Sequence, residues 1–181
     1  RGLEYLQDER SGFASELASI QWSYEDFSSY IFQKSLDLPQ VSTLMEQALE
    51  AKPQEKDILR TRLYHLLKED YRHQTVHRFE GMQFHFPDGE TFLRFAMPER
   101  YGDNVMLSRA VIRSANRYVR YARGFEVARS MSGYRFVYPL FSGTTHVGSV
   151  ELVVSPEVVT GILQEMYPER RFHLVVRKGL V

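Results

Sequence analysis

Charged side chains are interleaved with apolar ones in the segment GFEVARSMSGYRFVYPLF, residues 124–141. The first apolar run of this segment contains Glu126 and Arg129, and the second contains Arg135. A later apolar run, outside this segment, contains Glu151. Successive side chains of a strand point to opposite faces, so these runs predict one apolar face and one charged face. Opposed side chains on neighbouring strands lie about 5 Å apart, which is close enough for ion pairs. We therefore expect a covered structural network, and keep Glu126 and Arg135 as candidate ligand-binding residues as well.

Two further arginines are candidates for binding an anionic ligand. Arg94 lies in the predicted strand TFLRF, and a guanidinium group can hold a carboxylate or a phosphate through two parallel hydrogen bonds. The alternatives for Arg94 are a solvated residue or a structural partner of Glu126 or Glu151. Arg109 opens a predicted helix, and its guanidinium group is likewise a candidate for binding an anionic ligand, with a surface position as the alternative. The other arginines on the same predicted helical face, which we expect at the surface, are Arg113, Arg117, Arg120 and Arg123.

Two aromatic residues, Phe125 and Tyr138, complete the predicted site, either as pocket walls or as core residues. A metal site is not expected. His73 and His77 stand at metal-binding spacing and His85 follows, but the sequence has neither an HExxH motif nor a cysteine. It also has no Gly-rich phosphate loop and no GxSxG elbow. We therefore expect no cofactor and no catalytic function; a hydrolase or metal enzyme built on the histidines is a distant alternative.

The composition describes a folded domain that lacks the signature of a nucleic-acid binder. With 43% hydrophobic and 13% aromatic residues, the 181-residue chain can bury a substantial core. The 23 basic and 23 acidic residues balance, whereas a non-specific nucleic-acid binder would carry a basic excess. No apolar run approaches the roughly 18 residues that cross a bilayer. The chain begins at Arg1 without a signal peptide, so we expect a piece of a longer, membrane-anchored protein.

The first part of the chain is predicted to be helical. Apolar residues recur at steps of three, four and seven from Leu3 to Ile31, which indicates one long amphipathic helix. Two shorter helices are expected at Val41–Glu50 and from Pro53 to about Tyr71, because Pro39 interrupts the first helix and Pro53 suits a first helical turn.

The second part is predicted to be rich in strands. The turn signal PDG joins two alternating runs and predicts a hairpin. In order, we expect strands near Phe79–Phe86 and Thr91–Ala96, a helix of about fifteen residues from Val105, strands near Phe125–Arg129, Tyr134–Leu140 and His146–Val154, a helix at Pro156–Met166 and a closing strand RFHLVVRK, residues 171–178. This order predicts an α+β domain with an antiparallel sheet, the long helix covering one face and the crossover loop and helix the other.

The arrangement resembles the Cache domains, which are PAS-like extracytoplasmic sensor modules of bacterial transmembrane receptors. The similarity lies mainly between about Met82 and Val154 and is to the double-Cache type of chemoreceptors, sensor kinases and diguanylate cyclases. The residues that carry it are FHFPDGETFLRF, PERYGDN, Arg109, Asn116, GFEVAR, GYR, PL and HVGSVEL. A glycine usual in the family is replaced near Ala128. A full double-Cache unit is longer, so RFHLVVRK either completes this module or begins a second one.

The resemblance implies a fold, a location and a function. The fold would be an antiparallel PAS-like sheet packed on a long N-terminal helix and short helices, with a helical signalling region at 1–75 and a Cache sensor module at 76–181. The module would be periplasmic, part of an inner-membrane receptor, and would bind a small polar molecule; Arg94 and Arg109 favour an anionic, carboxylate-bearing one. The alternative is a protein-interaction module without a small-molecule ligand. The near-heptad steps of the first helix predict a homodimer through that helix, with packing on the sheet as the alternative.

Overall fold

The helices of the first part have the expected order. The computed structural model describes residues 2–128 and 131–175. A long helix passes through a π-helical turn and is followed by two helices whose first residues are Pro39 and Pro53, where a missing backbone N–H costs no hydrogen bond. These elements are α1 (Gly2–Ile31), η1 (Phe32–Leu36), α2 (Pro39–Glu50) and α3 (Pro53–Val76). No helix in the described ranges is long and apolar enough to span a bilayer.

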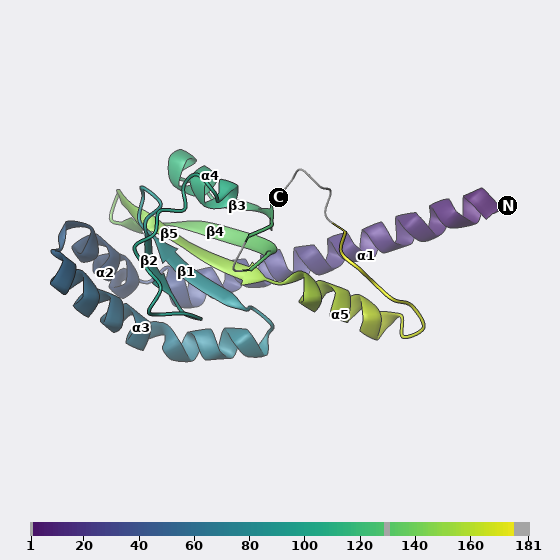
Figure 1. Cartoon of the computed structure of the whole chain (residues 1–181), viewed down its shortest axis with the longest axis horizontal. Coiled ribbons are helices and arrows are strands. Elements are labelled where there is room, and N and C mark those ends of the chain that lie inside the picture. The colour runs from purple at the N-terminus through teal and green to yellow at the C-terminus, as the bar shows by residue number, and fades with distance from the viewer. Residues whose placement is uncertain (1, 129–130, 176–181) are drawn as a thin grey trace.

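The strands form one antiparallel sheet of five in the order β2-β1-β5-β4-β3, as Figure 1 shows. The crossover from the hairpin to the meander contains α4, and α5 follows the last strand. The bounds are β1 (Gly81–His85), β2 (Thr91–Arg94), α4 (Ala110–Tyr118), β3 (Ala122–Glu126), β4 (Gly133–Ser142), β5 (Thr145–Val154) and α5 (Pro156–Met166). The predicted α+β, PAS-like architecture is confirmed.

The two faces of the sheet differ in chemistry, as the alternating pattern predicts. One face presents buried apolar residues such as Phe84, Phe136 and Leu152, which pack in a single core with α1, α2 and α3. The opposite face carries His85, Arg135 and Glu151 and lies under α4. The charged face is therefore covered by the crossover and does not face open solvent (Figure 1).

The apolar stripe of α1 packs within the chain. Phe13 makes edge contacts with Tyr167 and Phe172 at ring-centroid distances of 5.1 and 5.7 Å. Further along, Tyr24 and Phe27 pack on Phe79. The stripe from Phe13 onward therefore follows the packing alternative. The N-terminal half of α1 extends beyond the sheet (Figure 1), and its pairing with a second chain stays a prediction.

The crossover helix is shorter than predicted. The residues after Val105 form a turn, in which the backbone N–H groups of Ser108 and Arg109 both donate to the Val105 carbonyl. At the other end, Val119 has a φ of 49°, a left-handed conformation that ends the helix. The expectation that one helical face carries all five arginines is therefore wrong. Arg123 belongs to β3, which begins earlier than predicted, at Ala122.

Two other expectations concern the end of the chain and one charged residue. The closing strand predicted at 171–178 is not formed over 171–175, which have no regular structure, and its last three residues lie outside the described ranges. Arg129, predicted as part of the charged network, also lies outside the described ranges.

Candidate functional site

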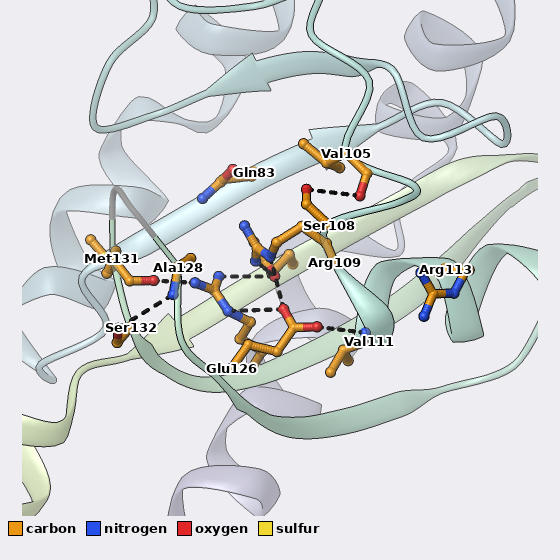
Figure 2. Close-up of polar contacts among 12 residues, drawn as sticks. Gln83, Val105, Ser108, Arg109, Val111, Arg113, Glu126, Ala128, Met131 and Ser132 are labelled. Carbon is orange, nitrogen blue, oxygen red and sulfur yellow. Dashed lines mark hydrogen bonds and ion pairs between the residues drawn. The ribbon is translucent and has the colours of Figure 1, made fainter. Parts of the chain in front are cut away.

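Four charged side chains form a buried cluster, here called the charge tetrad: Arg109, Glu126, Arg135 and Glu151. Arg109 donates from Nε to Glu126 Oε2 at 2.8 Å and from Nη2 to Glu151 Oε1 at 2.5 Å. Arg135 makes ion-pair contacts with the same two oxygens, at 3.3 Å to Glu126 and 3.0 Å to Glu151. Figure 2 shows Arg109 and Glu126 pointing toward each other in this cluster. The predicted network is therefore present, with Arg109 as a member that the strand pattern alone did not include.

The tetrad is positioned by strand register and by the start of α4. Residues opposite Arg135 and Glu151 in the ladders are Gly124 and Val137, so both charges lie on the face that Glu126 shares. Arg109 is the N-cap residue of α4, in an extended conformation. The second carboxylate oxygen of Glu126 accepts a hydrogen bond from the Val111 backbone N–H at 2.8 Å. Glu126 therefore also satisfies a free donor at the positive end of the α4 dipole.

The tetrad balances two positive charges with two negative ones in a largely buried region. The side chains of Arg135 and Glu151 are fully buried, and those of Arg109 and Glu126 are 8% and 11% exposed. Burial opposes ionisation of Glu151, but Arg135 and Arg109 outweigh it and lower the pKa of this carboxyl. Burial lowers the pKa of Arg135 against the opposite effect of Glu151. The cluster is stable only as a whole, because removing one member leaves an uncompensated buried charge.

A second group of polar residues lies beside the tetrad on the same face. His85 is fully buried, and neither of its ring nitrogens has a hydrogen-bond partner within the described part of the chain. Its cross-strand neighbour Ser149 and the helix residue Asn116 also present unpartnered polar atoms there. Burial is the main cause that lowers the pKa of His85 to about 4, with Glu151 opposing this shift and Arg109 and Arg94 adding to it. His85 is therefore neutral at physiological pH.

A pocket of about 860 Å³ opens on the charged face next to the tetrad, here called the arginine pocket. It is bounded by the loop between β2 and α4, by Arg109 and by the segment that follows β3. The lining residues are Arg94, Glu99, Arg100, Tyr101, Asp103, Val105, Ser108, Arg109, Val127 and Ala128. Both arginines predicted to bind an anion, Arg94 and Arg109, therefore line one pocket.

The two predicted arginines, Arg94 and Arg109, differ in which of their hydrogen-bond donors already have an acceptor in the described part of the chain. Arg94 holds Asp103 through two parallel hydrogen bonds of 2.7 Å and donates to the Arg100 carbonyl at 2.8 Å. This pairing lowers the pKa of Asp103 and fastens the loop. Arg109 uses Nε and Nη2 for the tetrad, and no described acceptor reaches its Nη1. One of the alternatives for Arg94 was a structural pairing with Glu126 or Glu151; this is wrong, because the loop supplies Asp103 instead.

The loop residues of the arginine pocket were not among the residues predicted from the sequence. Arg100 lines the pocket and is exposed, and its side chain makes only a 3.6 Å contact to the Met97 sulfur among described residues. Tyr101 and Ser108 line it as well. The available signal was the motif PERYGDN, which contributed to the family resemblance but supplied no candidate site residue.

Phe125 and Tyr138 lie on the other face of the sheet. Phe125 packs edge-on against Tyr134 with ring centroids 5.1 Å apart. Tyr138 stacks on Phe32 at 4.5 Å, and its hydroxyl shares a 2.7 Å hydrogen bond with Ser28 of α1. The structure therefore brings Arg94, Arg109, Glu126 and Arg135 together and separates both aromatic residues from them.

Comparison with known proteins identifies related sensor domains. A family model described as the double sensory domain of two-component sensor kinases, a double-Cache model, matches residues 33–159. The Escherichia coli DcuS sensor domain has a TM-score of 0.59 at 14% identity, with 80% of this chain and 97% of that one covered. The sensor domain of the Vibrio cholerae histidine kinase DctB has a TM-score of 0.63 at 14% identity, with coverages of 89% and 60%.

A chemoreceptor domain has the same fold. The ligand-binding domain of Campylobacter jejuni Tlp3, in complex with 4-methylisoleucine, has a TM-score of 0.50 at 11% identity. The match covers 82% of this chain and 59% of that domain, so the chain spans about three fifths of the Tlp3 and DctB domains. No curated protein matches the sequence.

We predict that substitutions within the tetrad change the free energy of unfolding in a strongly non-additive way. Glu151→Gln should lower the free energy of unfolding by about 3–5 kcal/mol, because it leaves an excess buried positive charge. The double variant Arg135→Met with Glu151→Leu keeps Arg109 and Glu126 balanced, and should cost clearly less than its two single changes combined. Urea unfolding measures all of these values. Glu165→Gln, which removes a solvent-exposed partner of Arg78, is the control and should cost under about 1 kcal/mol. Additive single effects would contradict the coupling.

We predict that the free energy of unfolding falls in mild acid because of His85. Because burial lowers its folded pKa from 6.5 to about 4, the unfolded chain binds a proton first as the pH falls. The free energy of unfolding should therefore fall between pH 6.5 and 4, by about 3 kcal/mol from this group. His85→Leu removes the titrating ring and should abolish this part of the pH dependence, whereas His73→Leu, at an exposed position, should retain it. Identical pH profiles for the wild type and His85→Leu would refute the assignment.

Proposed function

We propose a ligand for this chain from one premise: it belongs to the double-Cache family of extracytoplasmic sensory domains. Family membership confirms the expected sensor role and the expected periplasmic location. Within that role, we propose that the arginine pocket binds a small polar molecule that carries a carboxylate group. We further propose that the chain is the input module of a membrane-anchored receptor, and the family description favours a two-component sensor kinase among the receptor classes.

One observation carries the ligand proposal: two guanidinium groups of the pocket retain donors that no acceptor in the described part of the chain satisfies. Arg100 has no acidic partner among the described residues, and Arg109 keeps Nη1 free beside it in the lining. Three arginines line the pocket against two carboxylates, Glu99 and Asp103. A carboxylate is the planar group that matches such donors. Arg94 then acts as a positioning residue that holds the loop through Asp103.

The solved neighbours are consistent with such a ligand. The Tlp3 domain has been solved with isoleucine and with 4-methylisoleucine, and both ligands carry a carboxylate. The arginine pocket combines charged residues with the apolar Val105 and Val127, so it can contact an apolar part of a ligand as well. We propose no catalytic role for the chain, because sensing requires only that the ligand bind one conformation more tightly than the other.

A thermal-shift and calorimetric screen tests this proposal. The panel is short carboxylates, amino acids, amines and sugars, each added to the purified chain. A carboxylate at a hundred times its dissociation constant should add about 2.7 kcal/mol of stability. Arg100→Gln should then raise the dissociation constant about tenfold or more, because it removes a charge-assisted hydrogen bond. Arg72→Gln, an exposed arginine on α3 paired only with Glu69, is the matched control and should bind normally.

Two results would oppose the proposal. Unchanged affinity in Arg100→Gln and Arg109→Lys would show that the arginines do not hold the ligand. A panel without any binding would instead favour the protein-interaction alternative, in which a partner docks on the surface. Arg109→Lys also disturbs the tetrad, so its unfolding free energy must be measured beside its affinity.

The predicted division into 1–75 and 76–181 is proposed as a division of roles. A single core joins residues of α1, α2 and α3 to the sheet, so the two parts are coupled by direct packing. We propose that α1 is the signalling helix and leads toward the membrane. Its projecting N-terminal half is the segment available for pairing with a second chain, because the stripe from Phe13 onward is already packed.

The proposed homodimer can be tested by cross-linking, because the chain contains no cysteine. Arg10→Cys places a single thiol at an exposed position in the projecting half of α1 and should yield a disulfide-linked dimer under mild oxidation. Glu165→Cys, on the exposed surface of α5, is the control and should not form the disulfide-linked dimer. Sedimentation of the unmodified chain should show dimer at high concentration. A monomer throughout, with equal cross-linking of both variants, would exclude pairing through α1.

A further inference from the structure

A second pocket, of about 410 Å³, lies on the opposite side of the sheet from the arginine pocket. It is lined by Trp22, Glu25, Asp26, Ser29, Tyr121 and Tyr138, and is here called the aromatic pocket. Its first four residues follow one another at steps of three, one and three, so they share one face of α1. That face looks toward the outer edge of the sheet, where Tyr121 precedes β3 and Tyr138 belongs to β4.

Two tyrosine rings form a rigid aromatic floor. The rings of Tyr121 and Tyr138 lie 4.8 Å apart, and Tyr138 is itself stacked on Phe32. Hydrogen bonds fix both hydroxyls: Tyr121 donates to Glu25 Oε1 at 3.0 Å, and Tyr138 shares its bond with Ser28. The floor is therefore preorganised, and a ligand would not have to order it.

The third aromatic ring of the pocket, that of Trp22, is unusually exposed. Trp22 is 70% exposed, and no ring contact joins it to another described residue. An indole is a large apolar group that is normally mostly buried. At the rim of a pocket whose floor is already aromatic, its free face can cover a bound molecule.

The charge of the aromatic pocket is negative. Glu25 is engaged by Tyr121 and by an ion pair with Arg123. Asp26 is exposed, and no ion pair involves it in the described ranges. One carboxylate charge therefore remains uncompensated beside three aromatic rings. Aromatic faces attract cations through their quadrupoles, and a nearby carboxylate adds direct attraction.

We propose that the aromatic pocket is a second ligand site and binds a small organic cation, a quaternary ammonium or an alkylamine. The ammonium group would lie between Trp22 and the tyrosine floor, with Asp26 as its counter-charge. This site differs from the arginine pocket in face, in charge and in ligand class. A bound cation would contact α1 directly, because α1 supplies four of the six lining residues.

Trp22 provides a direct measurement, because it is the only tryptophan of the chain. Choline chloride added to the intact chain should change the Trp22 fluorescence in a saturable way. The uncharged isostere 3,3-dimethyl-1-butanol should not do so at the same concentration, and sodium chloride corrects for ionic strength. Binding should weaken as salt is raised, since the carboxylate is exposed.

Variants identify the counter-charge and separate the two pockets. Asp26→Asn should raise the dissociation constant for choline about threefold or more. Asp37→Asn, at an exposed aspartate outside the pocket, should leave it unchanged. Arg100→Gln, which tests the arginine pocket, should also leave choline binding unchanged, so failure of one proposal does not imply failure of the other.

Three results would overturn the second site. Equal responses to choline and to the alcohol would mean that charge plays no part. An unchanged dissociation constant in Asp26→Asn would exclude the proposed counter-charge. Trp22 emission that depends on protein concentration and not on choline would mean that a second copy of the chain covers this surface.

Discussion

The burial of four charges under α4 is the constraint on which the rest of this domain depends. An isolated ionised group in such a place costs several kcal/mol or more, so each charge requires the others at short range. The requirement constrains the register of three strands, because a slip of one residue would move Arg135 or Glu151 to the other face of the sheet, away from its partners. It also fixes where α4 starts, since Arg109 must reach the sheet from the N-cap position. An apolar core of similar volume would tolerate sliding that this cluster does not.

The loop that closes the arginine pocket depends on two further arginines, each inserted from a different element. Arg94 reaches it from β2 through Asp103. Arg60 reaches it from α3: its guanidinium lies 3.4 Å from the ring centre of Tyr101, and its Nε donates to the Phe92 carbonyl at 2.6 Å. The loop is thus attached to the helical layer as well as to the sheet. The pocket rim is therefore in direct contact with α3, which packs in the same core as α1.

The parts predicted from sequence are those set by short-range periodicity. Alternation placed Glu126, Arg135 and Glu151 on one face, and Pro53 gave the start of α3. Pro39 was predicted to interrupt the first helix, but it opens α2, two residues before the predicted start at Val41. The same alternation contained a signal that was not used. Tyr138 is an odd number of residues from Arg135, and Phe125 is adjacent to Glu126, so neither aromatic residue could share the charged face.

The parts that were missed depend on contacts between segments distant in sequence or on subtle backbone conformations. Asp103 pairs with Arg94 because the loop folds back on β2, which no local pattern specifies. The end of α4 at Val119 carries no glycine or proline, so the left-handed residue there gave no sequence signal. The aromatic pocket needs α1 to lie against the sheet edge, and its members are separated by about a hundred residues in sequence.

The two carboxylate oxygens of Glu126 accept from different elements, so this residue does more than complete the tetrad. One oxygen holds Arg109, and the other holds the first turn of α4 through Val111. An anion that competes for the Arg109 guanidinium would leave the first oxygen with Arg135 alone, at 3.3 Å, and the carboxylate could then turn about its bond to the Val111 N–H. Binding of an anion in the pocket would then alter the capping of α4, and the tilt of this short helix would report which molecule is bound.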